Sequence, residues 1–394
     1  MDFDFSDDLK QLRDEARRSL ERLGARAAAR TALEAAQGQA GREDAQALWR
    51  KLVELGWTGA GVPPHWGGSG MGTLALCLLA EELGRALAPV PFTASVVLAT
   101  EALLLAGSDE QKSRWLPQLA DGSMTGTLAI SEGHGAIAPQ GIASTVGGGR
   151  LTGLKLPVMD GLQACLAIVV APDEAGRWLH LVDLRESGGG QGLAGAEGVT
   201  REALATLDDS RPQARLHFHG AAAEPLQGQG WVAVERVLQR AAVVMAFEQL
   251  GVAQAALEMA RDYALERYAF GRPIGTFQAI KHKLADVYVA IELARSNAYR
   301  GAWALNRDAP ELPAAAAAAR IAATEAAWLA TKENLQTHGG MGYTWDLDCH
   351  LYYRRARMLA LALGGAHEWK RHLMDAISPK AGPQQRPPPD RQAA

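Results

Sequence analysis

The sequence predicts a mainly α-helical protein with a small β domain between two helical parts. Three observations predict this class. Apolar residues recur at three- and four-residue spacing in residues 1–126. Glycine and short β-like runs dominate residues 127–227. Helical spacing then returns over residues 228–378. The remaining segment, residues 379–394, is rich in proline, glutamine and arginine, which is typical of disorder.

The first part contains several helical patterns. The apolar spacing in Leu9–Leu12 and in Ala47–Leu55 indicates two amphipathic helices, and Gly56 is a suitable stop for the second. Leu74–Leu87 and Ala94–Gly107 are more uniformly apolar and predict two buried helices.

The middle part contains runs that favour β-strands. Three of them are Ala164–Val170, Trp178–Val182 and Ala214–His219, and glycine turns lie nearby at Gly147–Gly149 and Gly188–Gly190. Several short strands with turn signals predict a β domain with a barrel-like arrangement.

The last part predicts four long helices, namely Trp231–Tyr268, Thr276–Arg307, Pro313–His338 and Tyr352–Ile377. Proline suits the first turn of the third helix, and Gly339 suits its C-terminal cap. Long helices joined by short loops indicate a four-helix bundle.

Composition excludes some classes of function. The 394 residues carry a formal net charge of −4, which argues against a nucleic-acid binder. The longest apolar run is too short for a membrane span and contains Glu101. The three cysteines are scattered, without a CxxC pair, and the acidic start does not resemble a signal peptide. We therefore expect a cytoplasmic protein without a metal site.

Two segments carry the chemistry of a phosphate site. Arg267–Gln278 and Gln336–Tyr343 each join a long helical pattern to a glycine-containing turn with a cation or an amide. Backbone N–H groups at helix ends and arginine side chains both suit a diphosphate. Either segment alone is explained by solvated helix residues and a helix stop, but their combination favours a nucleotide site.

The order of the three parts and these motifs resemble the acyl-CoA dehydrogenase family over residues 6–377. The segments that carry the resemblance are LWRKLVELGWTGAGVPPHWGGSG, LAEELGRALAPVPF, EQKSRWLPQLADG, ALERYAFGRPIGTFQAIKHKLADV and QTHGGMGYTWDLDCHLYYRRAR. The resemblance implies oxidation of an acyl-CoA thioester between its α and β carbons. In the family a glutamate removes the α proton, FAD takes the β hydride, and an electron-transferring flavoprotein receives the electrons. Members are usually tetramers in which each FAD lies between a cis half from one subunit and a trans half from its neighbour.

The trans half is complete in this sequence. The resemblance implies that six residues reach the neighbouring subunit's FAD: Arg267, Phe270, Gln278, Gln336, Gly339 and Gly340.

The cis half departs from the family pattern at two places. In the loop Ser131–Ile137, the serine expected to bond the flavin or its phosphates is replaced by Ile137. In Lys155–Met159, the expected tryptophan and hydroxyl residue are replaced by Pro157 and Met159.

The catalytic base is also missing. The two positions that the family uses hold Leu363 and Ala241, neither of which can accept a proton. Glu248 lies two turns from Ala241, about 10 Å away, and we interpret it as a packing or hydrogen-bonded residue. His367 and Glu368 follow the base position, but their spacing does not fit direct substitution.

Three hypotheses remain open. The first is a non-catalytic, half-site subunit that pairs with a second acyl-CoA dehydrogenase subunit, as in subfamilies that degrade steroid side chains. The second is a self-sufficient homotetrameric enzyme with Glu248 or another unusual base. The third is a non-redox protein that binds acyl-CoA or has a structural role.

Overall fold

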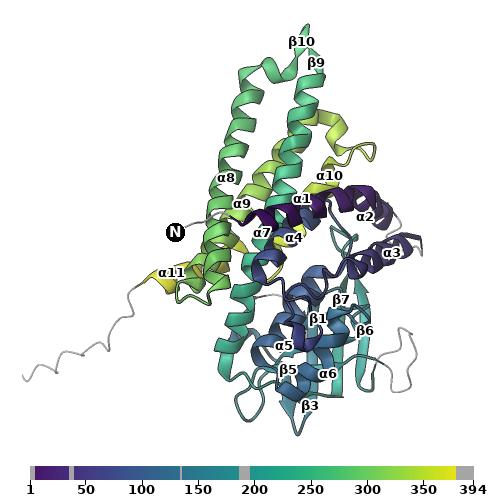
Figure 1. Ribbon diagram of the computed structural model, residues 1–394, viewed down its shortest axis with the longest axis vertical. Coiled ribbons are helices and arrows are strands. Elements are labelled where there is room, and N and C mark those ends of the chain that lie inside the picture. Colours follow the sequence, from purple (N-terminus) through teal and green to yellow (C-terminus); the bar gives the residue numbers. More distant parts are fainter. Residues whose placement is uncertain (1–4, 35–39, 134, 186–195, 379–394) are drawn as a thin grey trace, which may run out of the picture.

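The computed structural model describes residues 5–34, 40–133, 135–185 and 196–378. It confirms the predicted class, with helices at both ends of the described chain and a β part between them (Figure 1). The predicted turn at Gly188–Gly190 and the predicted disordered tail at 379–394 lie outside the described residues.

Among the N-terminal helices, α4 is almost fully buried; it packs against α1 and, more extensively, against the long helix Gly230–Glu266 of the C-terminal part. Ser6 caps the N-terminus of α1, and Ser108 and Gln111 form a capping box at the N-terminus of α6. The predicted helix at Ala94–Gly107 begins as a π-helical segment, η2, and continues as α5. The helical bounds are α1 Asp7–Arg22, α2 Ala25–Glu34, α3 Ala40–Glu54, α4 Thr73–Arg85, η2 Phe92–Ala99, α5 Thr100–Ala106 and α6 Asp109–Ala120.

The β part consists of two four-stranded sheets, ordered β1-β4-β5-β8 and β2-β3-β7-β6. Within the first sheet, β1 runs parallel to β4, whereas the other neighbours are antiparallel. The predicted strands correspond to β4, β5 and β7. The predicted runs did not include β1, β2, β3, β6 or β8; in β3, bulges interrupt the alternation. The bounds are β1 Gly126–Ala129, β2 Thr145–Gly147, β3 Arg150–Met159, β4 Leu166–Val170, β5 Leu179–Asp183, β6 Val199–Leu204, β7 Gln213–Ala222 and β8 Glu224–Pro225.

The C-terminal part is a bundle of α7 Gly230–Glu266, α8 Gln278–Asn306, α9 Leu312–His338, α10 Cys349–Leu361 and α11 Ala366–Ile377. The prediction of one helix over Tyr352–Ile377 was wrong. Leu363 and Gly364 have φ values of 61° and 92°, which an α-helix cannot contain, so the chain turns between α10 and α11.

A small hairpin, β9 Tyr268–Ala269 and β10 Arg272–Pro273, joins α7 to α8. Figure 1 shows this hairpin at the upper tip of the two helices, while the sheets lie at the lower end of the molecule. None of the helices in the described ranges is both long and apolar enough to cross a membrane.

Candidate functional site

The first predicted trans segment projects from the tip of the bundle. Arg267 caps the end of α7, and Gln278 begins α8. Both side chains are exposed, and no hydrogen bond or ion pair with another described residue engages them. Phe270 has a φ of 53° and is 96% exposed, with only an edge-to-face contact to Phe277 at 6.2 Å. A cation, an amide and an apolar ring are therefore presented outward together.

The second trans segment is the turn after α9. Gly339 has a φ of 61°, and no heavy atom lies within 4 Å of a Cβ built at Gly339 or Gly340. The backbone on this side is therefore open to close approach by a ligand. Gln336, in the last turn of α9, is exposed.

Ring stacking holds the second trans segment against the end of α7, just before the first trans segment begins. His338 stacks on Tyr263 of α7 with ring centroids 4.1 Å apart, and its Nδ1 lies 2.9 Å from the Asn334 carbonyl oxygen. Burial lowers the pKa of His338, opposed by that hydrogen bond. The neutral ring can donate from Nδ1 to this carbonyl and packs against Tyr263, so the glycine turn is held beside the end of α7.

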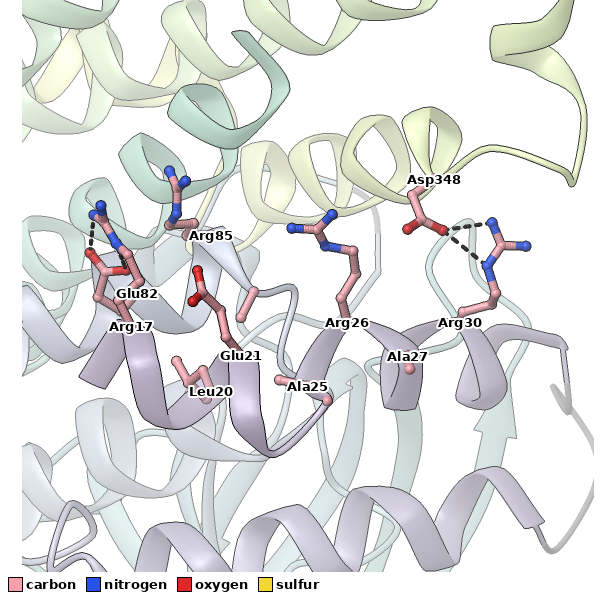
Figure 2. Close-up of a pocket in the computed structure, with 12 residues that line it drawn as sticks. Arg17, Leu20, Glu21, Ala25, Arg26, Ala27, Arg30, Glu82, Arg85 and Asp348 are labelled. Atoms are coloured by element: carbon pink, nitrogen blue, oxygen red, sulfur yellow. Dashed lines mark hydrogen bonds and ion pairs between the residues drawn. The ribbon is translucent and has the colours of Figure 1, made fainter. Parts of the chain in front are cut away.

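A charged cavity of about 410 Å³ lies between the first two helices and α4, and Asp348, just before α10, also lines it. Figure 2 shows ion pairs at its two ends. Arg17 donates two hydrogen bonds to Glu82, at 2.8 and 2.9 Å. Arg30 donates to Asp348 at 2.6 and 3.0 Å and to the Trp345 carbonyl at 2.5 Å. The second pair ties α2 to the segment between the glycine turn and α10.

The predicted cis loop is anchored by a buried ion pair. The Lys155 ammonium is fully buried and donates to Glu132 at 2.7 Å and to two backbone carbonyls. Burial acts to raise the pKa of Glu132, but hydrogen bonds, first among them that from Lys155, outweigh it and lower the pKa. The loop is therefore fixed at its start, before Ile137.

The residues of the cis half do not fit a flavin as the family pattern requires. Ile137 packs against the apolar core and offers no side-chain donor. Pro157 is exposed, and Met159 is buried, with its sulfur 3.3 Å from an Arg211 nitrogen. A ring-stacking tryptophan and a hydroxyl donor are thus absent from the described positions that would supply them.

The base turn, by which we mean the turn at Leu363 where the resemblance predicts a catalytic base, is apolar and is held by hydrogen bonds. Leu363 is 8% exposed, and its carbonyl accepts a hydrogen bond from the Trp369 indole at 3.0 Å. The buried Arg320 donates to the Ala362 carbonyl at 2.7 Å. Ala241, which the resemblance predicts as the alternative base position, is fully buried. Neither Leu363 nor Ala241 can take a proton.

Glu248 belongs to a buried ion cluster. It is 3% exposed and accepts a hydrogen bond from Thr93 at 2.7 Å. Its Oε1 lies 3.6 Å from Arg211 Nη1 and 3.8 Å from Arg355 Nη1. Those arginines also pair with Asp160 and Asp208 of the β part, at 2.9 and 2.6 Å, so the cluster joins all three parts of the molecule.

Sequence reasoning gave little weight to one acidic residue near the base turn. Glu368, in the first turn of α11, is 9% exposed, and its Oε1 has no hydrogen-bond partner among the described residues. Burial raises the pKa of this carboxyl, and the Ile137 amide and Arg371 only partly oppose that effect. In the sequence, Glu368 was marked only by its closeness to Leu363. The turn between α10 and α11 was predicted as helix, so the direction of the Glu368 side chain was not predicted.

Comparison with known proteins decides the family. A model of the acyl-CoA dehydrogenase N-terminal domain matches residues 6–123, and a model of the acyl-CoA dehydrogenase C-terminal domain matches residues 228–376. This chain belongs to the acyl-CoA dehydrogenase family. Members are flavoprotein oxidoreductases that act on the CH–CH bond of acyl-CoA.

Individual relatives and solved structures support the same family. The acyl-CoA dehydrogenase IpdE2 of Mycobacterium tuberculosis is 32% identical over 84% of this chain and 87% of its own length. A variant of the Tcur3481–Tcur3483 steroid ACAD superposes with a TM-score of 0.82 and 33% identity, covering 94% of this chain and 97% of the other. The ChsE4–ChsE5 complex of Mycobacterium tuberculosis superposes with a TM-score of 0.82 and 28% identity, covering 96% of this chain and 100% of the other.

Proposed function

We propose that this acyl-CoA dehydrogenase chain is the half-site subunit of a hetero-oligomer. The observation that carries the proposal is the base turn, where a rigidly held Leu363 stands in place of a carboxylate. Arg267 and Gln278, by contrast, are exposed, and their side chains form no hydrogen bond or ion pair with the residues that the structure describes. Such a chain needs a related subunit that supplies the base and the cis half of the flavin site.

The residues of this chain bind and orient the cofactor, and FAD, when bound, accepts the β hydride of the substrate. Arg267 supplies a planar, permanently charged guanidinium suited to phosphate oxygens. The open backbone at Gly339 and Gly340 supplies N–H groups that approach a diphosphate closely. Gln278 and Gln336 add amide donors, and Phe270 presents its apolar ring to the neighbouring subunit's FAD.

The substrate class follows by analogy. We infer an acyl-CoA with a bulky polycyclic group, supported by similarity to a protein described as a steroid ACAD. The ChsE4–ChsE5 complex, which pairs two differently named chains, supports a second acyl-CoA dehydrogenase subunit as the partner. An electron-transferring flavoprotein is the expected acceptor.

The surroundings of Glu248 weigh against the self-sufficient alternative. A base must reach the α carbon of the substrate, but this carboxylate is buried and faces two arginines that lie within 3.8 Å. The third hypothesis, a non-redox protein that binds acyl-CoA, predicts acyl-CoA binding with no flavin under any condition.

The test is the flavin content per chain, measured by absorbance and mass. The protein is expressed alone and then together with an acyl-CoA dehydrogenase chain that has a glutamate at the base turn. We expect little flavin alone and about one FAD per pair of chains in the complex. Arg267→Ala should lower the flavin content of the complex, and the matched exposed variant Arg261→Ala should not. Full flavin occupancy and turnover by the chain alone would refute the proposal.

A further inference from the structure

The charged cavity between α1, α2 and α4 has no part in the proposed flavin site, because none of the residues that we assign to FAD lines it. Its volume of about 410 Å³ is that of a small-molecule site and exceeds what a simple ion needs. Four arginines from these three helices contribute to its wall, namely Arg17, Arg26, Arg30 and Arg85. Guanidinium groups in this number suit an anionic ligand.

Ion pairs hold three of these arginines in place. The pairs of Arg17 and Arg30 lie at the two ends of the cavity (Figure 2). Arg85 donates from Nη2 to Glu258 on α7, but its Nη1 is buried and has no hydrogen-bond partner among the described residues. Because an unpaired buried donor is unfavourable, an acceptor in the cavity would stabilise this nitrogen. The wall therefore offers positioned guanidinium groups with a donor to spare.

Arg26 is the arginine of the wall without a carboxylate partner. Its guanidinium lies over the ring of the buried Tyr352, 5.8 Å from the centroid, and forms no hydrogen bond or ion pair with the rest of the described chain. Figure 2 shows this exposed side chain between the two ion pairs. It belongs to the first turn of α2, where Ala25 and Ala27 also line the cavity. No described backbone carbonyl accepts from the N–H groups of residues 25–27, so they add donors that suit an anion.

The acids of the wall decide what kind of anion fits. Glu82 and Asp348 are already paired with arginines. Glu21, in the last turn of α1, is exposed, and its carboxylate has no ion-pair or hydrogen-bond partner within the described ranges. A free carboxylate accepts hydrogen bonds from hydroxyl groups but repels a second anion. The wall thus suits a molecule with a phosphate at one end and hydroxyl groups at the other.

We propose that this cavity is a binding site for an organic phosphate monoester, a small molecule with one phosphate group and several hydroxyl groups. The phosphate lies at the first turn of α2, where Arg26 and the free N–H groups donate to its oxygens and Arg85 Nη1 adds a further donor. Glu21 accepts a hydrogen bond from a hydroxyl group of the same molecule. The site is additional to the flavin site and does not depend on the half-site function.

The test is isothermal titration calorimetry on the full-length chain at low salt. The probes are AMP and ribose 5-phosphate, which carry a phosphate ester, and adenosine, which carries none. Arg26→Ala removes the free guanidinium, and Arg85→Lys keeps a charge for Glu258 but removes Nη1. The control is Arg18→Ala, because Arg18 is an exposed arginine of α1 that does not line the cavity. Arg267→Ala distinguishes the cavity from the flavin site, and thermal unfolding verifies that each variant is folded.

Both phosphate esters should bind at a single site, and adenosine should not bind. Arg26→Ala should weaken their binding at least about tenfold, because charge-assisted hydrogen bonds to the phosphate are lost. Arg85→Lys should weaken it less, and Arg18→Ala and Arg267→Ala should leave it unchanged. If Arg26→Ala does not fold, Arg85→Lys carries the test.

Three results would overturn the proposal. One is the absence of binding by either ester at millimolar concentration. Another is binding that Arg267→Ala abolishes and Arg26→Ala leaves intact, because the esters would then occupy the flavin site. The last is a loss of assembly with the second subunit in Arg26→Ala while neither ester binds, because the cavity would then receive a group of the partner. The half-site function is tested separately, by the flavin content.

Discussion

Replacing Glu248 by glutamine separates a structural role from a catalytic one. Glutamine keeps the shape of the side chain and can still accept the hydrogen bond from Thr93, at 2.7 Å. It removes the negative charge that faces Arg211 and Arg355 at 3.6 and 3.8 Å, and its amide hydrogens point toward groups that only donate.

The expected loss in the free energy of unfolding depends on the ion pairs that Arg211 and Arg355 keep in the variant. Each ion pair is worth about 4 kcal/mol in gross Coulomb energy at an effective dielectric constant near 20. Arg211 keeps Asp160, and Arg355 keeps Asp208, so most of that attraction remains. Breaking a buried pair by removing one partner typically costs 3–5 kcal/mol. We therefore expect Glu248→Gln to lower the free energy of unfolding by about 3 kcal/mol.

The assay is urea unfolding followed by circular dichroism, with Glu325→Gln as the matched control. Glu325 pairs with Lys370 at 2.9 Å, but both side chains are more than half exposed, so its loss should cost less than about 1 kcal/mol. If Glu248→Gln is as stable as the control, binds flavin in the complex and abolishes turnover, the residue is catalytic and the structural reasoning is refuted.

Three further predictions concern the site and its scaffold. Burial lowers the pKa of His338, so the folded protein binds fewer protons than the unfolded chain. Its stability should therefore fall as the pH drops through about 6.5, and thermal unfolding should depend less on pH in His338→Gln. Phe270→Ala should leave the melting temperature of the isolated chain unchanged, since the ring is 96% exposed, but should weaken assembly with the partner in analytical ultracentrifugation; a loss of monomer stability would contradict this. Gly251→Ala should destabilise the protein by about 3 kcal/mol or more, because the added Cβ would lie 1.8 Å from a backbone oxygen of α4. In the same urea assay, Gly340→Ala should leave the stability unchanged.

Local patterns were sufficient for most of the fold. The spacing of apolar residues predicted the helices on both sides of the β part, and uniform apolar runs predicted the buried strands β4 and β5. The bulged strand β3 was missed, because its alternation is broken. The last helix was predicted without its interruption. The turn at Leu363, which has a positive φ, accepts hydrogen bonds from Arg320 and Trp369, and sequence spacing does not contain these contacts.

The sequence by itself determined the family motifs and the absence of a titratable group at positions 363 and 241, because leucine and alanine carry none in any conformation. Only the tertiary structure decided what the remaining acids do. Glu248 meets Arg211, from the turn before β7, and Arg355 of α10, while the Glu368 carboxyl folds back toward Gly364 in the turn before α11. A carboxyl group's role depends on which distant charges and cavities the fold brings within a few ångströms, and chain spacing alone does not encode those distances.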